Sequence, residues 1–218
     1  MKVTCISDTH QFLKNSEERE KLTALLSGGD CLVHAGDISG RGTVQEVQSF
    51  LDWFSSLNYT YKIFIAGNHD YLFEKESALA KSMVSEYPGL VYLNDSGTEV
   101  EGIKFWGSPI TPHFHNWAFN RFPDRILQHW EMIPDDTDFL ITHGPPRGIL
   151  DELEDSSRVG CPALLSKVLS VKPKVHVFGH IHCARGIDRI DRTIYINAAV
   201  LDESYRLVEA APFEIEIF

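Results

Sequence analysis

The sequence predicts an α/β protein in which strands and helices pack in layers. Short, β-branched apolar runs recur along the 218 residues, and helix-like stretches lie between them. Each run is continuously apolar, which is typical of strands that are buried on both faces. Strands that alternate with helices indicate an α/β layered sandwich. The runs cover residues 3–6, 31–35, 62–66, 104–106, 139–142, 175–178 and 193–196.

The clearest helix lies between the second and third runs. Apolar side chains repeat there at three-to-four spacing over residues 44–57, and Thr43 is a suitable N-cap. Similar stretches predict helices over 16–26, 74–87 and 162–171. Residues 107–123 are rich in proline and histidine and are expected to form a long irregular loop that serves a site. Because no repeat or linker divides the chain, we expect one domain spanning 1–218.

The composition excludes several classes of partner. The net charge of -11 would repel a polyanion, so extended nucleic acid is an unsuitable partner. The four cysteines are far apart and form no CxxC pair, which favours reduced thiols in the cytoplasm. The first apolar run starts at Val3 and leaves no space for a secretion signal, and no apolar run approaches the ~18 residues of a membrane span. Nothing in the sequence specifies an oligomeric state.

Polar side chains cluster directly after five of the predicted strands. Because the carboxyl ends of strands in α/β sheets converge on one crevice, we expect these clusters to meet there. Seven of the residues have side chains suited to metal binding, and we call them the cage. The cage consists of Asp8, His10, Asp37, Asn68, His143, His180 and His182.

The cage predicts two transition-metal ions. Two carboxylates, one amide oxygen and four imidazoles suit Mn²⁺, Fe or Zn²⁺, whereas Ca²⁺ prefers oxygen ligands alone. Seven ligands exceed the needs of one tetrahedral Zn²⁺, but they fit two ions that share a carboxylate.

The motifs that contain these residues differ in specificity. By chance, a chain of this composition would contain the DxH pattern of Asp8 and His10 roughly 0.7 times, and the GD pair that ends at Asp37 roughly once. The number expected by chance is roughly 0.03 for GHxH, which contains His180 and His182, and roughly 0.002 for GNHD, which contains Asn68. The second GD, Gly29-Asp30, precedes a strand and is interpreted as a turn. The prediction of a metal site therefore depends mainly on Asn68 and on the pair of His180 and His182.

In this order and spacing, the motifs resemble those of the calcineurin-like metallophosphoesterase superfamily over residues 8–182. Within it the chain is most similar to the branch called MPPED, through segments at 66–69, 107–109, 117–120, 142–146 and 158–161. The resemblance implies a four-layer αββα sandwich of two mixed β-sheets flanked by helices. It also implies one ion held by Asp8, His10 and His182, and a second held by Asn68, His143 and His180. Asp37 would bridge them.

The expected activity is hydrolysis of phosphodiesters or phosphomonoesters by a hydroxide that bridges the two ions. Small nucleotides, cyclic ones included, are suggested as substrates by the resemblance alone. In this hypothesis His69 faces the leaving group, and Asp70 fixes the tautomer and orientation of His69. The alternatives are a phosphoprotein phosphatase and a nucleotide-binding regulatory protein with little turnover. The complete cage and the His69-Asp70 pair favour an enzyme.

Other residues have competing interpretations. His113 and Arg158 are candidates for substrate binding, but both also fit an ordinary surface position. For His115, substrate contact and a surface position are equally supported. Asn197 either caps the neighbouring metal loops or is an ordinary strand-end residue. Arg41, like Arg158, either binds substrate phosphate through its guanidinium or is an ordinary solvated arginine.

For a further group of residues we favour a structural role. Trp117 and Phe119 fit loop packing better than stacking on a base. His34 and His176 lie inside apolar runs and are expected to be hydrogen-bonded histidines of the core or of its rim. Cys183 is expected to be a small turn residue instead of an extra ligand, because the cage already supplies enough ligands.

Overall fold

Strands and helices alternate along the chain in the computed structural model, which describes residues 1–10, 16–209 and 211–218. The helices are α1 (Ser16–Leu25), α2 (Val44–Ser56), α3 (Tyr71–Lys75), α4 (Ser77–Ser85), α5 (Pro123–Glu131) and α6 (Pro162–Val171), with a 3-10 turn at His182–Ala184. The first strands are β1 (Lys2–Ile6), β2 (Gly29–Ala35), β3 (Tyr59–Ile65), β4 (Leu90–Leu93), β5 (Ser96–Val100) and β6 (Ile103–Ser108). The later strands are β7 (Thr111–Pro112), β8 (Asn120–Arg121), β9 (Phe139–Thr142), β10 (Val175–Phe178), β11 (Gly186–Ile190), β12 (Thr193–Asn197) and β13 (Phe213–Glu216).

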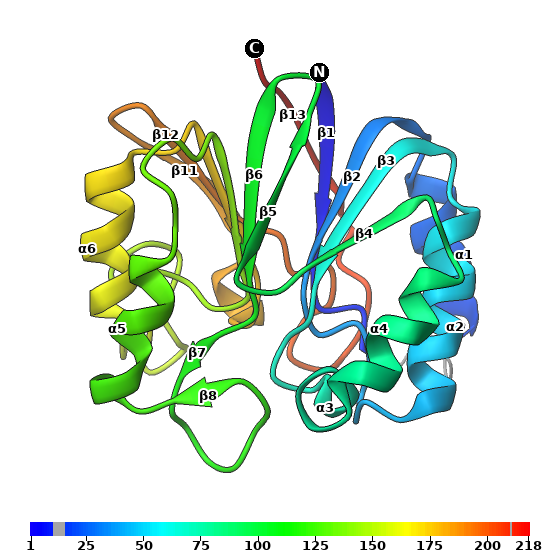
Figure 1. Cartoon of the computed structure of the whole chain (residues 1–218), viewed down its shortest axis with the longest axis horizontal. Coiled ribbons are helices and arrows are strands. Elements are labelled where there is room, and N and C mark those ends of the chain that lie inside the picture. Colours follow the sequence, from blue (N-terminus) through cyan, green and yellow to red (C-terminus); the bar gives the residue numbers. More distant parts are fainter. Residues whose placement is uncertain (11–15, 210) are drawn as a thin grey trace.

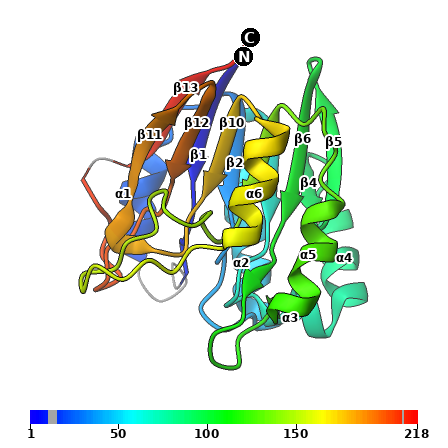
Figure 2. The same cartoon turned by 90° about the vertical axis from the view of Figure 1, so that its left-hand side faces the viewer.

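Two mixed sheets form the centre of the molecule. The first has the order β13-β1-β2-β3-β4, and the second has the order β11-β12-β10-β9-β6-β5. Neighbouring inner strands are parallel, whereas β13, β11 and β5 are antiparallel to their neighbours. The sheets face each other, with α1 to α4 outside the first and α5 and α6 outside the second (Figure 1). The view from the side shows α5 and α6 lying over the second sheet (Figure 2). The predicted αββα sandwich is confirmed.

Apolar side chains fill the space between the sheets and the space under the helices. Val33 and Ile63 of the first sheet share a buried cluster with residues of the second, where Phe105 stacks on Phe139 with ring centroids 4.8 Å apart. On the helix side, Phe50 of α2 packs against Phe64 of β3 at 5.4 Å. Thr43 caps α2 as predicted, in a capping box with Glu46. The two rigid sheets therefore hold their strand ends in place.

Several elements differ from the sequence-based expectations. The helix expected over 74–87 is divided into α3 and α4, because Glu76 adopts the non-helical φ of -128° and ψ of 49°. Strand β13 at Phe213–Glu216 was not expected, since its exposure alternates instead of being continuously low. The stretch 107–123 is not wholly irregular, because it contains the end of β6 and the short parallel pair of β7 and β8.

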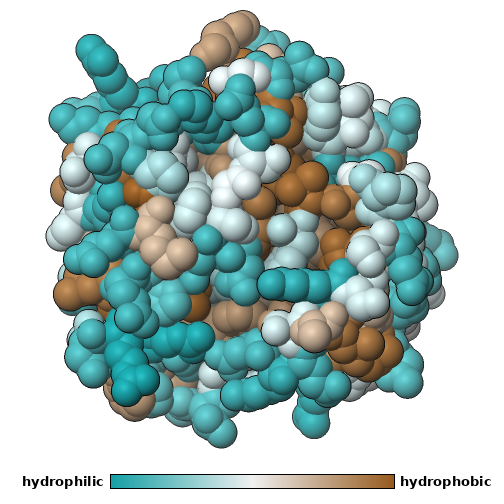
Figure 3. Space-filling view, in the orientation of Figure 1, coloured by the Kyte–Doolittle hydropathy of each residue, from teal (hydrophilic) through white to brown (hydrophobic). Residues whose placement is uncertain are grey.

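The surface in the orientation of Figure 1 is largely hydrophilic, with apolar side chains gathered between β5 and β4 (Figure 3). Within the described ranges, no helix combines the length and the apolarity needed to cross a bilayer.

Candidate metal centre

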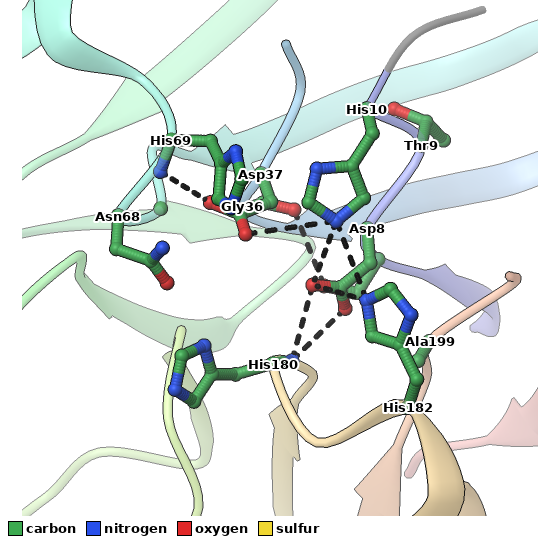
Figure 4. A network of polar contacts seen from close by, with 12 residues as sticks. Asp8, Thr9, His10, Gly36, Asp37, Asn68, His69, His180, His182 and Ala199 are labelled. Carbon is green, nitrogen blue, oxygen red and sulfur yellow. Dashed lines mark hydrogen bonds and ion pairs between the residues drawn. The ribbon is translucent and has the colours of Figure 1, made fainter. Parts of the chain in front are cut away.

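Both sheets contribute residues to one cluster at the carboxyl ends of their inner strands. Asp8 and His10 follow β1, and Asp37 and Asn68 follow β2 and β3. The three remaining cage histidines follow β9 and β10 of the second sheet. A parallel bridge between Ser7 and Ala199 joins the sheets beside the cluster. The structure thus brings together all seven residues of the predicted cage, most of which are visible in Figure 4.

The first group of ligand atoms belongs to Asp8, His10 and His182. The Nε2 atoms of His10 and His182 lie 3.3 Å apart, and they lie 3.8 and 3.6 Å from Oδ1 of Asp8, respectively. One ligand atom from each residue falls within a common distance of 4.8 Å. This is the group expected to hold one ion.

The second group forms around His143. Its Nε2 lies 2.9 Å from Oδ1 of Asn68 and 3.3 Å from Oδ2 of Asp37. The His180 ring is 5.0 Å from the His143 ring, and its ligand atom groups with those of Asp37 and His143. Oδ2 of Asp37 is also 3.7 Å from Nε2 of His10, so this carboxylate lies between the two groups. That is the position required of a bridging ligand.

Hydrogen bonds from outside the cage orient two of the rings. Nδ1 of His143 lies 3.0 Å from the carbonyl of Ala35, and Nδ1 of His182 lies 3.0 Å from the carbonyl of Asp202. Because a carbonyl can only accept, each Nδ1 must carry the proton and each Nε2 is directed toward the carboxylates. This is the usual arrangement of metal-binding histidines, so the residues present fit divalent ions.

The electrostatics of the cluster also favour cations. Burial lowers the pKa of His143 and His182, but the nearby Asp37 and Asp8 outweigh it and raise both values to about 9. The pKa values of Asp8 and Asp37 are lowered, because the histidine charges overcome the effect of burial. Two buried carboxylates therefore attract positive charge, which protons supply in the metal-free protein and metal ions would replace.

The backbone around the cage is strained. Asp8, His10, Asp37 and His180 have φ values of 58°, 41°, 54° and 70°, in the left-handed region that non-glycine residues rarely adopt. Each such residue costs on the order of 1–3 kcal/mol and persists only where the surroundings enforce it. Their concentration at one point is typical of a functional site.

The glycines of two motifs, Gly67 and Gly179, leave room for the metal-binding side chains. A Cβ on Gly67 would lie 2.3 Å from Oδ1 of Asp37, and a Cβ on Gly179 would lie 2.0 Å from Oδ2 of Asp8. Such distances are far below van der Waals contact. Glycine is therefore needed at these two positions of the GNHD and GHxH motifs, because the carboxylate of Asp37 or Asp8 occupies the space that a Cβ would fill.

His69 lies beside the cage, but its expected contact with Asp70 is wrong. Nδ1 of His69 lies 2.8 Å from the carbonyl of Gly40, to which it donates. The buried Asp70 carboxylate instead accepts from the backbone of Ile38, Ser39 and Gly67 and from the Ser39 hydroxyl. The carboxylate of Asp70 thus holds the loop that follows β2 and makes no hydrogen bond with the His69 ring in the described residues. It thus supports His69 only indirectly, through the loop that carries Gly40.

Burial and the charge of Asp37 raise the pKa of Asp70 to about 7 despite these hydrogen bonds. The His69 backbone donates to Oδ1 of Asp37 at 2.8 Å, so His69 is attached to the cage by its main chain as well.

The two predicted substrate-binding residues lie outside the cage. His113 is exposed and stacks on Phe122, with ring centroids 4.0 Å apart. Arg158 forms ion pairs with Asp151 at 3.2 Å and with Glu152 at 2.8 Å. Its charge is therefore already matched by carboxylates. From the loop of His113, it is Phe114 that reaches the cage, 5.0 Å from the His180 ring.

Tyr205 is a further neighbour of the cage, at a position that no sequence motif predicts. Its ring lies 5.1 Å from that of His10 and 5.7 Å from that of His182, and its φ is 59°. The residue belongs to the turn after β12, where its amide donates to the carbonyl of Asp202. No motif marks this turn, so only the fold reveals its position.

Three other residues support the loops of the cage. Asn197 donates to the carbonyl of Ile181 at 2.8 Å, as one of its two interpretations predicted. His34 accepts from the amide of Gly36 at 3.2 Å and contacts the Thr9 hydroxyl at 3.0 Å. His176 contacts the hydroxyl of Thr142 at 2.8 Å. Both histidines are buried and hydrogen-bonded, as predicted.

His176 is expected to make the protein sensitive to acid. Burial lowers its pKa from 6.5 to about 3, so the folded chain binds this proton less readily than the unfolded chain. Burial of the neutral ring is therefore tolerated above pH 6.5, and the folded state loses stability as the pH falls from 6.5 toward 3. By pH 4.5 the free energy of unfolding should have fallen by about 2–3 kcal/mol on account of this residue. Urea unfolding of the metal-free protein at pH 7.5 and pH 4.5 should therefore show a smaller loss for His176→Gln than for the wild type.

The matched control for this measurement is His115→Gln, since His115 is an exposed histidine. It should lose as much stability as the wild type. An equal loss in His176→Gln would contradict the assignment.

The chain matches known proteins over most of its length. The family model of the calcineurin-like phosphoesterases matches residues 1–184. Metallophosphoesterase domain-containing protein 1 of Homo sapiens is 38% identical, over 94% of this chain and 67% of the human protein. The similarity to the MPPED branch is thereby confirmed.

Solved structures share the fold at low sequence identity. The phosphopantetheinyl hydrolase of Mycobacterium tuberculosis has a TM-score of 0.63 and 17% identity, over 96% of both chains. An archaeal phosphodiesterase has a TM-score of 0.51 and 18% identity, over 99% of both chains. From the family match together with the Asp and His clusters, the chain belongs to the calcineurin-like phosphoesterase family and is a metal-dependent phosphoester hydrolase.

Proposed function

We propose that the chain hydrolyses phosphodiesters or phosphomonoesters of small molecules, nucleotides included, with two divalent ions held in the cage. The observation that carries the proposal is the position of Asp37 between two groups of ligand atoms. Asp8, His10 and His182 would hold one ion, and Asn68, His143 and His180 would hold the other. The mixed oxygen and nitrogen donors suit Mn²⁺, Fe or Zn²⁺.

The ions, when bound, supply the positive charge that polarises the phosphoryl oxygens and lowers the pKa of a water nucleophile toward ~7. The cage residues keep this charge at a fixed place, because their strands belong to two packed sheets. Asp8 and Asp37 are buried, so little solvent lies between their carboxylates and a bound cation. A phosphate ester would therefore be drawn to this positive site in a protein whose net charge is -11.

His69 is proposed to assist the leaving group. Its Nδ1 is occupied by the Gly40 carbonyl, so Nε2 is the nitrogen left to face a substrate. As a new bond forms between the attacking water oxygen and phosphorus, the ester oxygen leaves with the electrons of its bond to phosphorus. That oxygen takes a proton from Nε2 of the protonated ring, and the attacking water releases its own proton to solvent.

The comparisons give further support at the level of chemistry. Among the solved structures of this fold, one is a phosphopantetheinyl hydrolase and another is a phosphodiesterase. Cytoplasmic location is proposed as well, because all four cysteines are free thiols in the structure and free thiols are typical of a reducing compartment.

The test is an assay of the protein after removal of metal and reconstitution with Mn²⁺, Fe²⁺ or Zn²⁺. Bis(4-nitrophenyl) phosphate, 4-nitrophenyl phosphate and a panel of cyclic and linear nucleotides serve as substrates. We expect turnover with at least one metal and none with chelator. Binding of nucleotides without turnover under any metal would overturn the proposal and favour the regulatory alternative, whereas activity confined to phosphopeptides would favour a phosphoprotein phosphatase.

A further inference from the structure

The ring of Trp117 lies face to face with the ring of His69. Their centroids are 4.2 Å apart and the planes differ by 28°. On another side, the His10 ring meets His69 edge-on at 4.7 Å. Nδ1 of His69 is hydrogen-bonded to Gly40, so Nε2 is the ring nitrogen that remains available to a substrate. In the described part of the chain, Nε2 has no hydrogen-bond partner. Trp117 therefore packs on the proposed proton donor itself.

The position of Trp117 is fixed by its neighbours in the chain. The loop between β7 and β8 is attached to the segment 68–74, which contains His69, by hydrogen bonds on both sides of Trp117. These bonds are Tyr71 hydroxyl to Asn116 carbonyl at 2.7 Å, Ala118 amide to Asn68 carbonyl at 3.1 Å, and Phe119 amide and Arg121 guanidinium to Glu74 carboxylate at 3.0 and 2.9 Å. The indole is thus held against His69 before any substrate arrives.

A fixed ring plane matters because proton transfer depends on direction. One hydrogen bond at Nδ1 still allows the imidazole to swing about that bond, whereas a flat partner on its face restricts the swing. A misplacement of about 1 Å at a reacting group can cost about a hundredfold in rate.

We propose that Trp117 is a positioning residue that holds the plane of His69 so that Nε2 faces the leaving oxygen. The inference rests on the proposed function, in which His69 protonates that oxygen. It assigns the indole to the chemistry of the leaving group and not to the affinity for the substrate. Loss of the indole is therefore expected to lower kcat and to leave KM nearly unchanged.

The experiment compares substrates that need the proton to different degrees. Methyl 4-nitrophenyl phosphate releases an acidic phenol that leaves unaided, whereas methyl phenyl phosphate releases a more basic one; the matching monoesters serve if the chain prefers those. With the metal-loaded protein, Trp117→Leu should lower kcat on the phenyl ester by about 10- to 100-fold and on the 4-nitrophenyl ester only a few-fold. Trp117→Phe keeps a flat ring and should recover most of the loss.

A double variant separates this inference from the function on which it rests. If Trp117 acts through His69, then Trp117→Leu should cause no further decrease in kcat when His69 is already replaced by alanine. An equal cost in both backgrounds, or an equal loss on both esters, would overturn the positioning role. If instead His69→Ala lowers kcat by the same factor on both esters, then His69 is not the proton donor. That outcome would contradict the proposed function and not the role of Trp117 alone.

Phe122→Leu is the matched control. It removes an exposed aromatic side chain from the same region, one that stacks on His113 and not on His69, and should leave both rates unchanged. The metal content of each variant, measured by mass spectrometry, shows whether the cage is intact, so that a loss caused by missing metal is not attributed to His69.

Discussion

Replacing Asp37 by asparagine is expected to remove phosphoesterase activity almost completely, with a loss of at least about a thousandfold in kcat. Oδ2 of this residue lies 3.3 Å from Nε2 of His143 and 3.7 Å from Nε2 of His10. The carboxylate thus groups with His143 and His180 on one side and with His10 and His69 on the other. An amide has no charge with which to join two cations. The variant should therefore also bind fewer metal ions, which inductively coupled plasma mass spectrometry would measure.

The control is Asp30→Asn, which changes the aspartate of the other Gly-Asp pair. Asp30 is exposed and accepts a hydrogen bond from the Lys2 amide, far from the cage. Its variant should keep full metal content and full activity. An Asp37→Asn protein that retained two ions and normal turnover would show that this carboxylate is not a bridge.

Replacing Gly67 by alanine is expected to damage both stability and the cage. The new Cβ would lie 2.4 Å from the Asp37 amide nitrogen and 2.7 Å from Cε1 of His143, so the backbone itself must move. Overpacking of this kind typically costs about 1–3 kcal/mol, and the displaced ligands should lower kcat by about a hundredfold or more. Urea unfolding and the metal-loaded assay would measure the two effects.

Gly89→Ala is the control for this change, since a Cβ at Gly89 meets nothing within 4 Å. It should match the wild type in stability and activity. Equal behaviour of the two alanine variants would mean that the loop at Gly67 adapts without disturbing its neighbours, and that the close packing has no functional role.

The layers and the cage were predictable because their signals are local. A continuous apolar run such as 31–35 predicts a buried strand, and a polar residue directly after it, such as Asp37, predicts a position at the sheet edge. Convergence of these edges then follows from the fold class. The grouping of the seven residues required no knowledge of loop conformation.

Features that depend on loops from different parts of the chain were not predictable. The Asp70 carboxylate binds the loop at Ser39, 31 residues earlier, so its adjacency to His69 in sequence was misleading. The position of Tyr205 depends on a turn that carries no motif. The contact of Trp117 with His69 depends on hydrogen bonds between the loop that joins β7 to β8 and the segment 68–74. Glu76 interrupts a stretch with good helical periodicity through its backbone angles, which the apolar pattern does not indicate.

The division of the cage between two sheets makes metal binding a cross-link. Asp8 and His182 are far apart in sequence and lie in different layers, so neither sheet alone assembles even the first group of ligand atoms. An ion held there would stabilise only the state in which both sheets are docked, by an amount that grows with the free metal concentration. Metal supply would then decide not only how fast the protein works but also how firmly its two halves stay closed.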